Sequence, residues 1–127
     1  MTTPTRERNA LFSTLVGLTS LAILLQAVWA GLFIRAGQAN DGAWVTVHAR
    51  GAEVAFVLAL AAAVVAYWRL RSRRELLAGS IALVVLLAFE AFIGGEVFDR
   101  PGLQVVHFPL ALALMALAVW LPLRSRR

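Results

Sequence analysis

The chain has 127 residues, 61% of them hydrophobic, and a formal net charge of +5 at pH 7. Its mean hydropathy of +0.79 indicates an integral membrane protein, because a soluble domain of this size would carry much more polar surface. There is no cysteine, which excludes disulfides, thiolate metal sites and thiol catalysis. The arginines cluster at the ends of apolar segments, which is typical of membrane topology signals, so we expect no nucleic-acid partner.

Four apolar segments make up nearly the whole chain. Each is long enough to cross the hydrocarbon core of a bilayer, which takes about 20 helical residues. We therefore predict an all-α integral membrane fold, with a single domain over residues 1–127 that forms a bundle of four transmembrane helices. The predicted helices cover about residues 10–34, 44–68, 76–98 and 103–123.

The first apolar segment follows a short polar leader that contains Arg6 and Arg8. Residues 28–30 (VWA) have the small-residue pattern of a signal-peptide cleavage site. The apolar run before them is longer than the core of a typical signal peptide. We therefore expect this segment to remain in the protein as a helix.

The second apolar segment, bounded by Trp44 and Trp68, carries a line of small residues on one helical face. Spacings of three and four residues place His48 and five alanines on this face. The alanines are Ala52, Ala55, Ala59, Ala62 and Ala66. Such a stripe allows another helix, or a flat ligand, to approach the backbone closely. Helix packing is the more common use of this pattern.

The arginine distribution predicts the orientation. Arginines are concentrated in the leader, in the loop at residues 69–75 and at residues 124–127, whereas the two other loops contain Asp41 and Asp99. By the positive-inside rule we expect a protein of the cytoplasmic (inner) membrane with both termini in the cytoplasm. The second and fourth helices then run in parallel, and the histidines near their starts lie close to the outer leaflet.

The two halves of the chain contain a short internal repeat. Residues 26–31 (QAVWAG) resemble residues 90–95 (EAFIGG), and residues 47–48 (VH) match residues 106–107 (VH). Each half thus has a polar residue on an outgoing helix and a histidine on the returning helix. Parallel repeats in membrane proteins often build a site at their interface. We therefore predict a bundle of two repeated helix pairs with its polar groups in one layer.

The only two histidines, His48 and His107, are the first candidates for a site, because ionisable side chains inside a membrane are usually functional. Imidazoles facing each other suit the axial positions of a haem iron, and a four-helix bundle can hold the macrocycle. We therefore expect one haem, haem b, between these two ligands. With both axial positions occupied by protein, such a haem favours electron transfer over oxygen chemistry.

Four further residues complete the predicted site. Gly51 is expected to make room for the ring, and Arg50 to meet its propionates, with Arg35 and Arg100 as alternatives. A local ion pair between Arg50 and Glu53 is also expected from their spacing. Gln26 is expected to donate an interhelical hydrogen bond. Glu90 is costly in lipid unless it is protonated or bonds His107 or a haem edge.

The pattern of Gln26 or Glu90 with a nearby small-residue pair, followed by a histidine early on the next helix, resembles one half of haem A synthase. It is also similar to small four-helix bacterial membrane proteins that share this layout. The resemblance covers about residues 24–121 and implies that His48 and His107 are the axial pair. The chain departs from the synthase in having only one half, and in having Trp44 or Thr46 where a glutamate precedes the histidine.

Two function classes follow. The first is a small b-type cytochrome, which is an electron carrier rather than a stand-alone enzyme. It would pass electrons between a membrane reductant, such as a quinol, and a redox protein at the outer face. The alternative is a haem-free small transporter, or an accessory subunit of a larger complex, in which Glu90 and the histidines form a proton or cation path. The alternative to haem ligation is that the two histidines cap helix ends or hydrogen-bond across helices. Homo-oligomerisation stays open.

Overall fold

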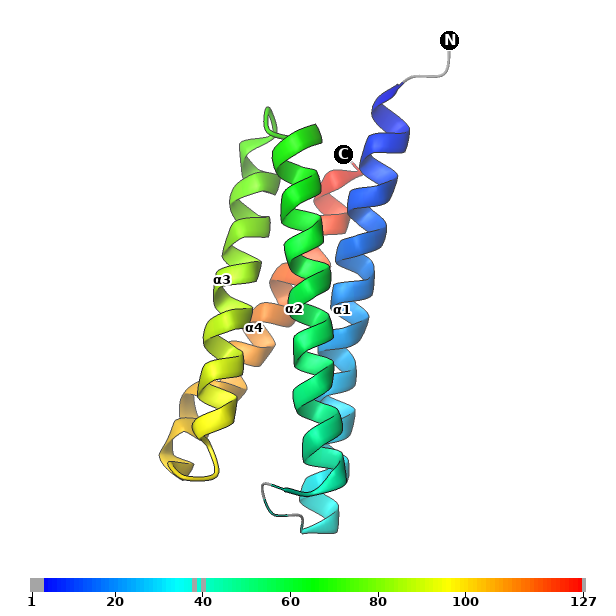
Figure 1. Cartoon of the computed structure of the whole chain (residues 1–127). Helices are drawn as coiled ribbons and strands as arrows, with labels where there is room; N and C mark the ends of the chain where they lie inside the picture. Colours follow the sequence, from blue (N-terminus) through cyan, green and yellow to red (C-terminus); the bar gives the residue numbers. More distant parts are fainter. Residues whose placement is uncertain (1–3, 38, 40, 127) are drawn as a thin grey trace.

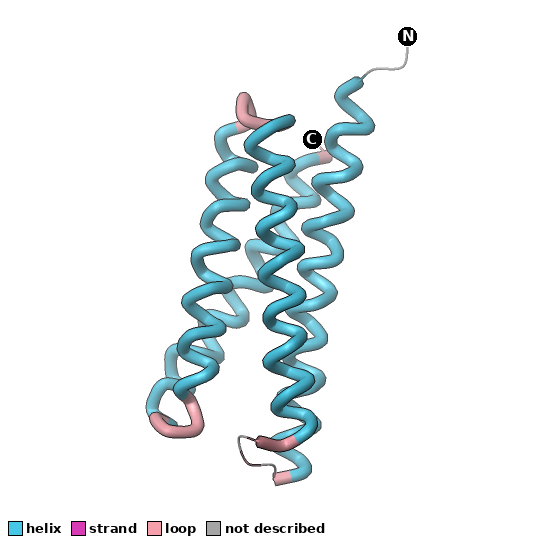
Figure 2. The backbone as a smooth tube through the Cα atoms, viewed as in Figure 1, coloured by secondary structure: helices cyan, strands magenta, loops and turns pink. Residues whose placement is uncertain are grey.

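The computed structural model describes residues 4–37, 39 and 41–126, and side chains from residue 10 onward. Within these ranges it consists of helices and short turns (Figures 1 and 2). The elements are α1 (Pro4–Ala36), α2 (Ala43–Arg69), α3 (Arg74–Glu96), a short 3₁₀ helix η1 (Pro101–Leu103) and α4 (Gln104–Ser125). Four of these helices are long and apolar enough to cross a membrane, which confirms the predicted helical bundle.

The helix boundaries agree with the sequence prediction except at the start of α1. This helix begins at Pro4 instead of near residue 10, and proline is favoured in the first helical turn because its φ angle is already helical. The end of α1 is marked by Gly37, whose φ of +59° lies in the left-handed region. Glycine adopts this conformation without a steric penalty, so it closes the helix efficiently.

The four long helices form a ring in chain order. α1 packs against α2 and α4, and α3 packs against the same two helices, whereas α2 and α4 make no close backbone approach in the part of the chain that is described. Both termini lie at the same end as the α2–α3 turn (Figure 1). We call this the arginine end. The end with the α1–α2 and α3–α4 turns is called the histidine end.

The small-residue stripe of α2 lies in the core. Its four alanines at positions 55, 59, 62 and 66 are each at most 1% exposed, which confirms the predicted buried face. Larger side chains of the other helices fill the space that the alanines leave; they include Phe12, Val16, Leu76, Leu83, Leu114 and Leu121. Pairing small residues with large ones lets helices pack closely in a bundle.

The core is concentrated toward the arginine end. The last buried residue of α1 is Ile23, and the first buried residue of α4 is Leu114. Beyond these positions the α1–α2 pair and the α3–α4 pair move apart, as Figure 2 shows. At the histidine end the rings of Phe33 and Phe98 bridge the two pairs, with centroids 6.3 Å apart.

Serine hydroxyls join the first and last helices. Ser20 Oγ lies 2.9 Å from the carbonyl oxygens of both Val16 and Ala118 and shares its hydrogen between them. Nearer the arginine end, the hydroxyls of Ser13 and Ser125 are 2.5 Å apart. Hydrogen bonds between helices are useful in an apolar bundle, because a lone hydroxyl would remain unpaired there. They help close the ring between α1 and α4.

Candidate functional site

Glu90 on α3 and His107 on α4 form a buried pair. The carboxylate Oε1 lies 2.9 Å from Nδ1 of the imidazole, and the two side chains are 11% and 16% exposed. Although this distance is short, the ring N–H does not point at the oxygen. Nδ1 and both carboxylate oxygens therefore have no hydrogen-bond partner among the described residues.

The imidazole of His107 rests directly on the backbone of α3 at Gly94. A Cβ atom placed on this glycine would lie 3.0 Å from Cε1 and 3.6 Å from Nδ1 of the ring. The missing side chain is therefore what lets the ring approach the helix this closely. Gly94 lies one helical turn after Glu90 on the same face, so the two residues together set the position of His107.

His48 on α2 is held in a similar way by α1. Its Nδ1 lies 3.1 Å from the backbone carbonyl oxygen of Gln26, to which a protonated Nδ1 donates. The side-chain amide of Gln26, oriented to satisfy its neighbours, accepts from the Ala52 N–H at 3.1 Å, and its nitrogen lies 2.7 Å from the His48 carbonyl and 3.2 Å from Nδ1, to which it donates when that nitrogen carries no proton. Gln26 thus makes hydrogen bonds between α1 and α2, as expected. Its amide lies between the His48 carbonyl and the Ala52 N–H, which are both backbone groups of α2.

Two other predicted site residues lie away from the imidazole rings. Gly51 is buried against α1, where a Cβ atom would overlap the ring of Trp29 and the amide of Gln26. It therefore makes room for α1. Arg50 is 74% exposed and forms the predicted ion pair with Glu53, at 2.8 Å.

The remaining neighbours of His48 connect the two halves of the site. The ring of Phe33 meets His48 edge-on at 5.5 Å, with an interplanar angle of 81°. The ring of Phe33 also contacts that of Phe98, which follows α3, with centroids 6.3 Å apart. The contributions of Phe33, Phe98 and Trp29 were missed from the sequence, because aromatic residues near helix ends are common in membrane proteins.

The two imidazoles are the groups of this site that could hold a metal or a haem iron. In both histidines Nδ1 faces a group of the preceding helix, a carbonyl for His48 and a carboxylate for His107, which leaves Nε2 as the ligating atom. Metal-binding histidines usually hydrogen-bond through their other ring nitrogen, as His48 does with Gln26; Nδ1 of His107 lies close to Glu90 without such a bond. No group of three or more His, Cys, Asp or Glu side chains that could hold a metal ion gathers within the described ranges.

No family model, curated protein or solved structure matches the chain.

We expect Gly94→Ala to destabilise the site, and Gly95→Ala to serve as its matched control. Both substitutions gain helix propensity, worth about 0.5–1 kcal/mol, and a Cβ atom at Gly95 meets nothing within 4 Å. At Gly94 the new methyl group must displace the His107 ring, and such overpacking costs about 1–3 kcal/mol. Thermal melting of the purified variants should therefore rank Gly95→Ala above Gly94→Ala. The reverse order would show that His107 does not rest on α3.

Proposed function

We propose that this protein is a small b-type cytochrome in which His48 and His107 hold one haem b. The observation that supports this most is the matched setting of the two imidazoles. Each has Nδ1 beside a group of the preceding helix, Gln26 or Glu90, and each stands on one of the two helices that do not approach each other, α2 and α4. Two free Nε2 atoms on opposite helices are the arrangement that bis-histidine ligation of a macrocycle requires.

The residues around the ligands have separate tasks in this proposal. The carbonyl of Gln26 would accept from Nδ1 of a ligating His48, whose Nε2 would bind the iron. Glu90 does the same for His107, and its carboxylate also makes this imidazole a stronger donor. A bound haem supplies one-electron chemistry, and the protein occupies both axial positions. The exchange partners would be a quinol in the bilayer and a redox protein at the histidine end.

The proposal places the chain in the cytoplasmic membrane as two repeated helix pairs. Both termini and the α2–α3 turn share one end (Figure 1), and most of the arginines belong to these segments. By the positive-inside rule this end is cytoplasmic, so the site lies toward the outer face. The matched polar contacts of Gln26 with His48 and of Glu90 with His107 support the repeat. They also agree with the resemblance to one half of haem A synthase.

The second candidate is a haem-free transporter or accessory subunit, which the unpaired oxygens of Glu90 favour. Counted as a whole residue, Glu90 is only 8% exposed. Buried ionisable groups in membranes often mark proton or ion paths. Absorption spectroscopy separates the two candidates. A wild-type protein that shows no Soret band after purification, and gains none when haem is added, belongs to the second class.

We expect His48→Ala and His107→Ala each to lose haem or to convert it to a high-spin form, because each removes one axial bond. The measurement is the absorption spectrum of the purified protein in its oxidised and reduced states. Thr46→Ala and Val106→Ala are matched controls on the same helices, since both side chains are exposed, and both should keep the wild-type spectrum. An unchanged low-spin spectrum in both histidine variants would show that the ligands are elsewhere.

We expect Glu90→Ala to weaken haem binding by about 10–100-fold, the usual effect of removing the group behind a metal-bound histidine. Glu90→Gln should weaken it less, because an amide oxygen can still accept from Nδ1. The measurement is a haem titration of the protein prepared without haem. Glu96→Gln, at a glutamate of the same helix that pairs with Arg100 at 3.7 Å, should have no effect. Equal affinity for all of these variants would remove Glu90 from the site.

We expect a fluorescent protein fused to the C-terminus to be bright and an alkaline phosphatase fused there to be inactive, because the arginine end should face the cytoplasm. A phosphatase fused in the α1–α2 loop should be active. The opposite pattern would move the histidine end to the cytoplasmic side.

A further inference from the structure

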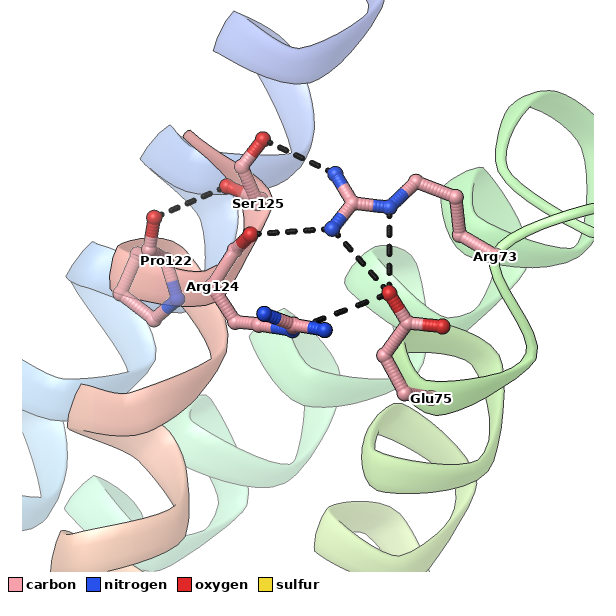
Figure 3. Close-up of polar contacts among 5 residues, drawn as sticks. All are labelled: Arg73, Glu75, Pro122, Arg124 and Ser125. Atoms are coloured by element: carbon pink, nitrogen blue, oxygen red, sulfur yellow. Dashed lines mark hydrogen bonds and ion pairs between the residues drawn. The ribbon is translucent and has the colours of Figure 1, made fainter. Parts of the chain in front are cut away.

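The α2–α3 turn is tied to the end of α4 by one arginine, Arg73 (Figure 3). Its guanidinium donates to the carbonyl of Arg124 at 3.0 Å and to the carbonyl of Ser125 at 3.3 Å. It also donates twice to Oε1 of Glu75, at 3.2 and 3.1 Å. The carbonyls of the last helical turn lack partners within the helix, so Arg73 caps α4. Each of its three nitrogens donates at least once within the protein.

We call the contacts of Arg73 with Glu75 and with the end of α4 the Arg73–Glu75 clamp. It brings together arginines that are far apart in the sequence. Arg124 lies beside the clamp, with Nε 3.8 Å from Oε1 of Glu75. Among the residues whose side chains are described, the other arginines of this end are exposed and form no ion pair; they are Arg69, Arg71, Arg74 and Arg126. Of the described side chains on the α2–α3 turn and at the end of α4, only Glu75 carries a carboxylate, so this surface keeps an excess of positive charge.

Exposed aromatic residues surround this surface on the side of the helices. Trp68 and Tyr67, in the last turns of α2, are 74% and 59% exposed, and Trp120, near the end of α4, is 43% exposed. Tryptophan and tyrosine with this exposure are typical of the headgroup level of a bilayer. The unpaired arginines thus stand at the depth of lipid phosphates.

We propose that the arginine end binds the phosphate of an anionic phospholipid through the guanidinium groups of Arg71, Arg74 and Arg126. All basic residues of the chain are arginines, and the guanidinium group matches phosphate with two parallel hydrogen bonds, which lysine cannot provide. The Arg73–Glu75 clamp holds the turn and the α4 end in a fixed relation, so the binding groups are arranged before the lipid arrives. The ligand is a lipid phosphate rather than a soluble one because the aromatic residues place its acyl chains alongside α2 and α4.

The test compares two double variants of equal charge, Arg71→Gln/Arg74→Gln at this surface and Arg35→Gln/Arg100→Gln at the histidine end. Each protein is incubated with equal amounts of phosphatidylglycerol and phosphatidylcholine of the same acyl chains, and the retained lipids are counted by native mass spectrometry. The wild type should retain phosphatidylglycerol preferentially. Each arginine near a charged headgroup strengthens the binding of an anionic lipid by roughly fivefold. The double variant at the arginine end should therefore lose on the order of thirtyfold of the preference for phosphatidylglycerol over phosphatidylcholine.

The control double variant should keep the wild-type preference, and both variants should melt at the wild-type temperature in phosphatidylcholine alone. An equal loss in both variants would show a general charge effect without a site, and would overturn the proposal. Retention of the preference in the first variant would do the same. Inorganic phosphate, added at the concentration of the lipid, should not displace it; displacement would identify a site for a soluble anion. None of these outcomes depends on haem.

Discussion

The structure depends most on how the carboxylate of Glu90 is accommodated inside an apolar bundle. A buried charge or unpaired polar group is costly in a low-dielectric medium, and the only ionisable side chain in contact with Glu90 among the described residues is His107. This contact requires α3 and α4 to be neighbours and requires a glycine at position 94, where the imidazole rests. One pair therefore constrains the order of the helices and the packing of the histidine end.

The two ends of the bundle serve different purposes. Toward the arginine end, the alanines of α2 and the larger side chains of the other helices form a continuous core. Toward the histidine end, burial of α1 and α4 stops and the helix pairs move apart (Figure 1). In a proposed haem protein this division is useful, because the tight half holds the helices in place while the looser half presents the ligands.

Local patterns were enough to predict the helices and some of their contacts. The length of each apolar run set the four segments, and the spacing of the alanines identified the buried face of α2. The ion pair of Arg50 with Glu53 followed from a separation of one helical turn. The early start of α1 at Pro4 was missed, because a polar leader has no hydropathy signal and its helix continues from the apolar segment that follows.

By itself, the sequence determined an all-helical chain with four segments able to cross a membrane, and it identified Gln26, His48, Glu90 and His107 within them as candidate site residues. Only the tertiary structure decided which neighbour each group meets. Helical periodicity defines a face but not the rotation of one helix against the next, so it could not foresee that Gly51 faces Trp29 or that Phe33 bridges His48 and Phe98. Nor could it place Arg73 at the end of α4, since that contact joins segments separated by two helices.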